Sequence, residues 1–183
     1  AQFPQMRERF LTEARASNRV EHRAVLRVHD EGVADDGSSY IVMDLLRGRT
    51  LGEYLERIGH LSPEQALLVA HEILEALMAT HEAGVLHRDI KPGNLFLNSD
   101  GRVLLVDFGI ARLDESRTLT QVGVPIGTPS FMPPEQAAGR WHEVEERTDL
   151  WSLGATLFTL LTGQAVRQVT TIADELQVAA TTP

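Results

Sequence analysis

The side chains best suited to chemistry lie in two short loops: Asp89, Lys91 and Asn94 in the first, Asp107 in the second. Between the loops, two short apolar runs flank the turn-forming sequence Asn-Ser-Asp-Gly, which predicts a β-hairpin. An antiparallel pair places its two outer ends side by side, so Asn94 and Asp107 should face the same small volume. Their oxygen atoms suit a hard divalent cation such as Mg²⁺. Asp89 is placed to take a proton from an incoming hydroxyl, and Lys91 can neutralise phosphate charge.

Lys91 is the only lysine of the chain, in which every other basic residue except the histidines is an arginine. A single lysine at the position that would face phosphate is consistent with a demand for a compact ammonium group there. It also means that no second lysine of this chain can act elsewhere.

The pattern His-Arg-Asp-x-Lys-x-x-Asn, followed by Asp-Phe-Gly, resembles the catalytic core of a bacterial eukaryotic-type serine/threonine protein kinase. The resemblance implies Asp89 as the base, Lys91 on the transferred phosphoryl group, and Asn94 and Asp107 on Mg²⁺, which Mn²⁺ could replace. It also implies ATP as the nucleotide and the serine/threonine branch, because of the lysine two places after Asp89. The plain alternative is a solvated turn, with Asp107 capping its own loop.

The bulk composition narrows the classes of partner. The chain has 183 residues, enough for one domain with a core, and a formal charge of −9, which argues against nucleic acid or anionic membrane as the main partner. The absence of cysteine excludes disulfides and thiolate metal sites. No apolar run is long enough to cross a bilayer and no signal-peptide pattern is present, so we expect a cytoplasmic segment without membrane contact.

The first 50 residues carry a helical pattern and then two strand patterns. Residues 5–20 resemble the kinase C-helix, which makes Glu13 the glutamate that pairs with the strand-three lysine in that family; a surface glutamate is the alternative. Residues 25–29 and 40–44 predict two strands, similar to kinase strands four and five. Met43 would then be the gatekeeper, or otherwise a core residue at a buried strand end. The resemblance implies a nucleotide site that includes Glu13, Met43, Asp44, Leu46 and Phe96.

Two helices should follow. Residues 51–58 form a short amphipathic pattern, and Ser62 and Gln65 form a capping box that opens a long helix ended by Gly84. The long helix resembles the kinase E-helix, on which the catalytic loop rests.

The histidines point to structural positions. His71 and His81 are expected on the helix surface, because no third ligand lies near them to complete a metal site. By resemblance, His87 packs on Phe108. A general-base role for His87 is the alternative, although Asp89 already fits that role.

Residues 110–130 lack a helix or strand period and predict a long mobile loop, similar to an activation segment. Thr120 lies where related bacterial kinases carry a phosphothreonine, with Thr118 close by, and Arg88 is the expected counter-charge. An unmodified loop is the alternative. By resemblance, Thr128 bridges Asp89 and Lys91.

The end of this segment reads Pro-Pro-Glu where the family usually has Ala-Pro-Glu, with Glu135 as its glutamate. Thr148 and Asp149 are expected to cap a helix that ends at Gly163 and is buried all round. It resembles the F-helix, which implies that Asp149 binds the backbone of the His87–Arg88 turn. Residues 172–180 give a weak signal for one more helix.

The expected fold class is α+β and protein-kinase-like. Residues 1–46 would form a partial N-lobe and hinge (C-helix and strands four and five), and residues 47–183 a partial, mostly helical C-lobe with catalytic loop, activation segment and F-helix. No glycine-rich phosphate loop precedes Glu13, the later arginine that pairs with Glu135 in the family is missing, and the first residue is Ala rather than Met. We therefore expect the middle piece of a kinase domain.

Three functions compete. The first is part of an active serine/threonine kinase that transfers the ATP γ-phosphoryl group to protein hydroxyls. Such a kinase could form dimers for autophosphorylation. The second is a non-catalytic, pseudokinase-like binding or scaffold module. The third, a metal-dependent hydrolase using Asp89 and Asp107, leaves Lys91 and Thr128 unexplained. We expect the 183-residue piece alone to transfer phosphate poorly or not at all, since the nucleotide clamp supplies positioning and charge.

Overall fold

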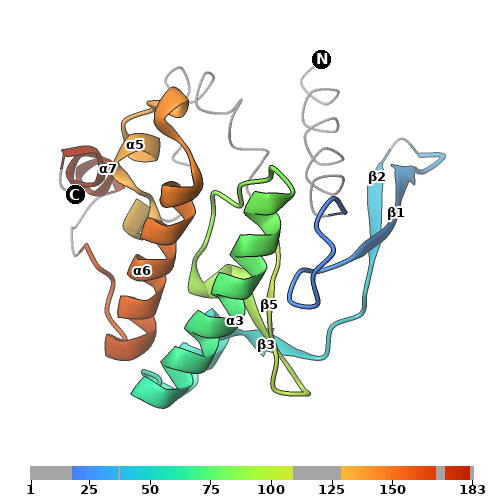
Figure 1. Cartoon of the computed structure of the whole chain (residues 1–183), viewed down its shortest axis with the longest axis horizontal. Coiled ribbons are helices and arrows are strands. Elements are labelled where there is room, and N and C mark those ends of the chain that lie inside the picture. Colours follow the sequence, from blue (N-terminus) through green and yellow to red (C-terminus); the bar gives the residue numbers. More distant parts are fainter. Residues whose placement is uncertain (1–17, 37, 109–128, 168–171, 182–183) are drawn as a thin grey trace.

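The computed structural model describes residues 18–36, 38–108, 129–167 and 172–181. Within these ranges a two-stranded ribbon stands beside a larger part made of helices and a small three-stranded sheet (Figure 1). The predicted helix at 5–20 and most of the predicted loop at 110–130 lie outside the described residues. So do four residues to which the sequence assigns roles: Glu13, Thr118, Thr120 and Thr128.

The ribbon consists of β1 (Val28–Val33) and β2 (Ser39–Met43), paired antiparallel with an irregularity between Val28 and Asp30. The second strand was predicted nearly in place, but the prediction that the first begins at residue 25 is wrong. Val25 instead forms a parallel bridge with Leu105, and the Leu105 N–H donates to the Ala24 carbonyl at 2.7 Å. The residues before β1 thus join the ribbon to the second sheet.

That sheet has the strand order β3-β4-β5, with β3 at Gly48–Thr50, β4 at Leu95–Asn98 and β5 at Val103–Leu105. The β4–β5 hairpin was predicted, and its register pairs Leu95 with Leu105. The β3 strand lies on the other side of β4, with Arg49 opposite Leu97. This sheet carries the two loops with the chemical side chains at one end and the hairpin turn at the other.

Two helices that begin with capping boxes pack against the sheet. In α2 (Leu51–Ile58) the Thr50 hydroxyl and the Glu53 carboxylate cap reciprocally, and in α3 (Pro63–Glu82) Ser62 and Gln65 do the same. The predicted bounds and the predicted Ser62–Gln65 box are confirmed. Each box satisfies backbone donors that a helix start otherwise leaves unpaired.

The C-terminal part contains α5 (Pro134–Ala137), α6 (Glu146–Thr162) and α7 (Ile172–Thr181), with single 3-10 turns at Pro129–Phe131 and Trp141–Glu143. The α6 helix begins at Glu146, three residues before Asp149, because Glu145 and Thr148 form its capping box. The predicted cap at Thr148 and Asp149 is therefore wrong, whereas the end at Gly163 is confirmed.

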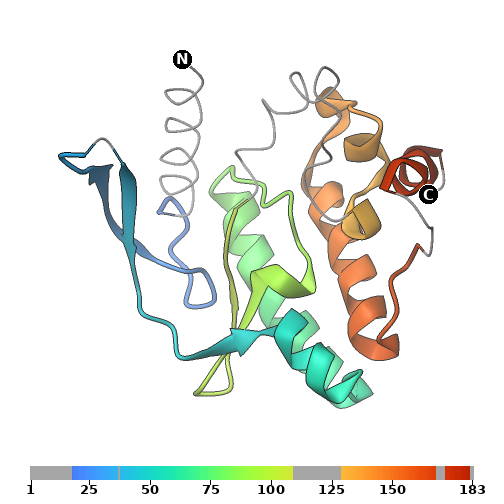
Figure 2. The same cartoon turned by 180° about the vertical axis from the view of Figure 1, so that it is seen from behind.

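The prediction that α6 is buried all round is also wrong. Leu150, Phe158 and Leu161 are 47%, 44% and 42% exposed and lie on one face of the helix. The opposite face packs against α3, beside which α6 lies in both views (Figures 1 and 2). The fully buried core joins these helices to the sheet and the first loop through Ile73, Leu77, Ile90, Leu95, Leu105 and Leu160. Among the described residues, no helix combines the length and the apolar character that a membrane span needs.

Candidate active site

The first loop is held by one buried carboxylate from the start of α6. Asp149 accepts the backbone N–H groups of His87 at 2.9 Å and Arg88 at 2.7 Å. It also accepts the Nε2 proton of His81 at 2.8 Å. Burial alone would raise the pKa of Asp149, but these hydrogen bonds and the nearby His87 bring its pKa below the ordinary value. The prediction of His81 as a surface residue is wrong: its side chain is only 10% exposed, whereas His71, at 69%, does lie on the surface.

His87 has no exposed surface and both of its ring nitrogens have backbone partners. Nε2 lies 3.1 Å from the Val106 carbonyl, and the Asp89 N–H donates to Nδ1 at 3.2 Å, which fits the neutral ring protonated on Nε2. Burial lowers the pKa of His87, against the opposing effect of nearby Asp149 and Asp89. The ring also packs on Phe108, with centroids 4.8 Å apart. This arrangement leaves no ring nitrogen for a substrate hydroxyl.

Three side chains of the first loop meet at one oxygen atom. The Lys91 ammonium lies 3.0 Å from Asp89 Oδ2, and the Asn94 amide nitrogen donates to the same Oδ2 at 2.8 Å. A second bond from that nitrogen, also 2.8 Å, reaches the Asp89 carbonyl. The 3-10 turn η1 (Pro92–Asn94) makes this possible by folding the chain back between Asp89 and Asn94. The Asp89 carboxylate is thus oriented from two sides.

The hairpin brings Asp107 to the same end of the sheet as Asn94. The Val106 N–H donates to the Asn94 carbonyl at 3.0 Å, which extends the pairing of β4 and β5 to the residue before Asp107. Asp107 is exposed and has a φ of 57°. Within the described part of the chain, the non-glycine residues with positive φ are Asp107 and Arg88, whose φ is 67°. Such backbone strain concentrates at functional sites.

The donor chemistry at this end fits a divalent cation. Because the Asn94 amide nitrogen is engaged by Asp89, its oxygen is the atom that remains toward a cation, and Asp107 adds a carboxylate. Hard cations such as Mg²⁺ prefer this all-oxygen set and take their remaining ligands from water and phosphate.

Comparison with known proteins identifies the fold. The family description "Protein kinase domain" matches residues 2–181. The chain belongs to the protein kinase family. It is 40% identical over 169 residues to the probable serine/threonine-protein kinase PknB of Corynebacterium glutamicum, covering 90% of this chain and 26% of that protein. It is 36% identical over 165 residues to the serine/threonine-protein kinase PknA of Mycobacterium tuberculosis, covering 88% of this chain and 38% of that protein.

A third relative, a probable serine/threonine-protein kinase of Streptomyces coelicolor, is 41% identical over 167 residues, or 88% of this chain and 24% of that protein. The chain thus spans about a quarter to two fifths of the length of these relatives. The predicted family and the α+β, kinase-like fold class are confirmed. Kinases of this family in general use ATP and a divalent metal ion to act on protein substrates.

Residues 129–136 are tied to the first loop, to α6 and to Arg167. The Thr148 hydroxyl donates to Glu135 at 2.7 Å, and the Gln136 side-chain amide donates to the Arg88 carbonyl at 3.3 Å. The buried Arg167 donates to the carbonyls of Pro129 and Met132, at 3.3 and 2.9 Å.

Arg167 also lies 4.6 Å from the centre of the Trp151 ring. These contacts of Arg167 were not predicted, because its partners precede it by up to 38 residues and show no local pattern with it. These contacts of a buried guanidinium hold residues 129–132 against the start of α6.

The residues predicted to form the hinge lie at the end of the β1–β2 ribbon and directly after it. Met43 is 44% exposed, so the alternative of a core position for Met43 is wrong. Asp44 is held at one end of the ribbon, where its Oδ1 lies 2.6 Å from His29 Nε2 and its N–H donates to the Arg27 carbonyl at 3.2 Å. Leu46 and Phe96 are half-buried.

Proposed function

We propose that this chain carries the catalytic residues of a serine/threonine protein kinase, which transfers the γ-phosphoryl group of ATP to serine or threonine hydroxyls of proteins. The observation that carries the proposal is the meeting of Lys91 and Asn94 on one oxygen of Asp89, at the sheet end where Asp107 follows. Phosphoryl transfer needs an oriented hydroxyl and stabilised phosphate charge, and these residue types supply both.

Each residue has a distinct task in this proposal. Asp89 orients the substrate hydroxyl and accepts its proton, and Asn94 fixes the carboxylate for that purpose. Lys91, 3.0 Å from Asp89, neutralises charge on the transferred group. The oxygen atoms of Asn94 and Asp107 would hold Mg²⁺, which when bound neutralises phosphate charge.

The remaining assignments complete the proposal. Residues 1–46 would form the N-lobe part and hinge, and residues 47–183 the C-lobe part. The nucleotide would contact Glu13, Met43, Asp44, Leu46 and Phe96, and Thr128 would join Asp89 and Lys91. The need for ATP favours a cytoplasmic reaction.

Control would come from Thr118 or Thr120, phosphorylated by a second copy in a transient dimer. The buried Nε of Arg88 has no hydrogen-bond partner among the described residues, which supports pairing of this guanidinium with an added phosphate.

The rival functions differ in what they leave unexplained. A metal-dependent hydrolase that uses Asp89 and Asp107 gives no task to Lys91, whose ammonium lies 3.0 Å from Asp89. A non-catalytic binding module does not require the Asp89 carboxylate to be oriented by both the Asn94 amide and the Lys91 ammonium. The kinase function accounts for all of these groups.

The test uses the full-length protein and measures transfer of labelled phosphate from ATP·Mg²⁺ to a serine-containing protein. Asp89→Asn and Asp107→Asn should each reduce the rate by about a hundredfold or more, since each removes a group acting on the reacting atoms. Asp100→Asn, in the exposed turn of the same hairpin, is the matched control and should keep the rate. Nucleotide binding without any transfer by the unaltered protein would identify the binding module instead.

A further inference from the structure

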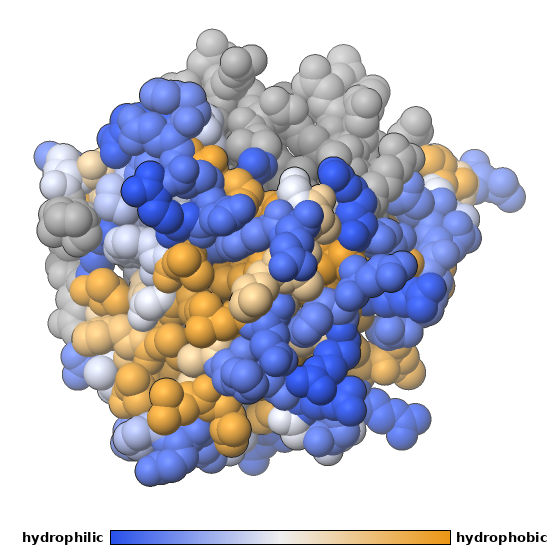
Figure 3. Space-filling model, viewed as in Figure 1, coloured by the Kyte–Doolittle hydropathy of each residue, from blue (hydrophilic) through white to orange (hydrophobic). Residues whose placement is uncertain are grey.

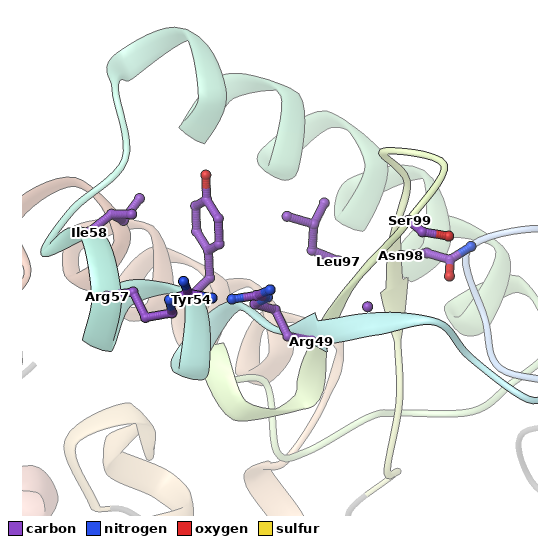
Figure 4. A pocket seen from close by; sticks show the side chains of 8 residues that line it. Arg49, Tyr54, Arg57, Ile58, Leu97, Asn98 and Ser99 are labelled. Atoms are coloured by element: carbon purple, nitrogen blue, oxygen red, sulfur yellow. The ribbon is translucent and has the colours of Figure 1, made fainter.

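A cavity of about 510 Å³ opens between β3, α2 and the turn end of β4 (Figure 4). Arg49, Tyr54, Arg57, Leu97 and Asn98 are among the residues that line it. Asn98 is four residues along β4 from Asn94, which at about 3.3 Å per residue places the cavity roughly 13 Å from the catalytic end of the strand. The cavity is therefore separate from the site described above.

Two positive charges face this cavity without a counter-charge. The guanidinium groups of Arg49 and Arg57 extend toward one another below the Tyr54 ring (Figure 4). In the part of the chain that the structure describes, neither guanidinium makes a hydrogen bond or an ion pair. Other arginines of this chain, such as Arg140, are paired with glutamate. In a chain with a net charge of −9, two unpaired arginines at one cavity mark a place for an anionic group.

An apolar groove continues from the cavity. A second hollow of about 210 Å³ shares Tyr54 and Leu97 with the first and is lined mostly by apolar side chains such as Leu68 and Val103. Gln65 and Glu72 also line it, and the Glu72 carboxylate accepts the Val103 N–H at 2.6 Å. Leu68 is 68% exposed, so its side chain is available to an apolar partner. The charged cavity and the apolar groove together form one surface, here called the Arg49–Leu68 surface.

The floor of the Arg49–Leu68 surface is fixed before any ligand binds. The Ser99 N–H donates to the Arg47 carbonyl at 2.6 Å, and the Arg47 N–H donates to the Asn98 side chain at 3.2 Å. These bonds tie the hairpin turn to the chain that enters β3. A preformed site loses little conformational entropy on binding.

We propose that the Arg49–Leu68 surface docks an acidic and apolar peptide segment of the protein substrate, and this rests on the proposed kinase function. Carboxylates of the segment would pair with Arg49 and Arg57, and an apolar side chain would enter the groove beside Leu68. The two arginines favour an anionic ligand. The adjoining groove favours a peptide over free phosphate, because it can take an apolar side chain that phosphate lacks. Docking this far from Asp89 raises the local concentration of the substrate hydroxyl through the intervening peptide.

The first test measures binding without catalysis. A fluorescein-labelled peptide of alternating glutamate and leucine is titrated with the full-length protein in the absence of ATP, and anisotropy is recorded. We expect binding that weakens with rising NaCl, because the ion pairs are near the surface. The double variant Arg49→Gln/Arg57→Gln and the variant Leu68→Ser should each weaken binding at least tenfold. The control Arg27→Gln/Arg147→Gln, which removes the same two charges at exposed positions outside this surface, should leave it unchanged.

The outcomes separate docking from catalysis. Undiminished binding by Arg49→Gln/Arg57→Gln overturns the docking proposal. So does inorganic phosphate binding at the arginines with no effect of Leu68→Ser, which would show a simple anion site. In the phosphorylation assay, the arginine variant should raise KM at least tenfold for a substrate fused to the peptide and leave kcat unchanged. If the unaltered protein binds the peptide but transfers no phosphate, the proposed kinase function is refuted and the docking proposal is supported.

Discussion

At the scale of single residues, the loop that contains Asp89 is held by buried side chains outside its own proposed reacting groups. Asp149 accepts two backbone N–H groups from His87 and Arg88 while fully buried. Hydrogen bonds to a charged group contribute about 1.5–3 kcal/mol each, enough to offset the unfavourable φ of 67° at Arg88. His87 in turn fixes Asp89 and Val106 through its two ring nitrogens. The position of Asp89 thus depends, through His87, on Asp149 in the first turn of α6.

The neutral state of His87 predicts a pH dependence of stability. Its pKa is lowered in the folded chain by burial, so the unfolded chain binds the proton more readily. The stabilisation is therefore present above the unfolded pKa of about 6.5 and is lost as the pH falls toward the folded pKa. One proton gives a slope of at most about 1.4 kcal/mol per pH unit in the free energy of unfolding.

Urea unfolding between pH 5 and 8 measures this slope. His87→Gln should unfold at lower urea and show a smaller slope between about pH 6.5 and 5 than the unaltered protein. His71→Gln, at an exposed histidine, serves as control and should retain the full slope. Equal slopes for His87→Gln and the unaltered protein would mean that His87 is charged in the fold.

At the scale of elements, β3 is joined to β4 by an approach that only glycine permits. A Cβ atom at Gly48, whose φ is 156°, would lie 2.0 Å from the Leu97 carbonyl oxygen. Gly48→Ala should therefore lower the free energy of unfolding by about 2–4 kcal/mol, through the steric overlap and the backbone strain together. Thermal or urea unfolding measures the loss.

Gly101→Ala separates the two contributions to that loss. Gly101 has a φ of 87° but open space around its Cβ position, so only the backbone cost of about 1–2 kcal/mol is expected. If the two variants lose the same stability, the close approach of β3 to β4 is not what requires glycine at position 48.

The elements also show which features a sequence can predict. The capping box of Ser62 and Gln65 and the β4–β5 hairpin are specified by neighbouring residues, and both were predicted. The start of α6 was misplaced because Glu145 and Thr148 form a box just ahead of the equally plausible cap at Thr148 and Asp149. Local patterns do not choose between two adjacent caps.

Contacts between distant residues account for the other errors. His81 was placed on the surface because its partner, Asp149, follows 68 residues later. Val25 and Leu26 were assigned to the first strand, although the Leu105 backbone pairs with them across the fold. The arginines at the cavity beside β3 carry no motif at all. The meeting of Asp89, Lys91 and Asn94 could be anticipated because all three lie within six consecutive residues, 89–94.

At the scale of the whole molecule, apolar side chains gather on the surface over α6 and α3 (Figure 3). Leu150, Phe158 and Leu161 contribute from α6, and Leu67 and Met78 from α3. Exposed patches of this kind attract apolar dyes and neighbouring molecules, whereas the net charge of −9 keeps copies apart at low salt. Salt should therefore promote self-association by screening the charge.

Replacing part of this face should reduce both effects without unfolding the chain. Phe158→Gln/Leu161→Gln should lower the fluorescence of bound anilinonaphthalene sulfonate about twofold and suppress the rise in light scattering between 50 and 500 mM NaCl. The loss in the free energy of unfolding should be roughly 0.5 kcal/mol or less per site, because both positions are half-exposed. Val33→Gln, at a hydrophobic residue on β1 with a similar 42% exposure, is the control and should change neither signal. If scattering persists in the α6 variant, another surface mediates the self-association. The next candidate is the edge of the β1–β2 ribbon, which has no further strand among the described residues, since unpaired strand edges recruit other strands.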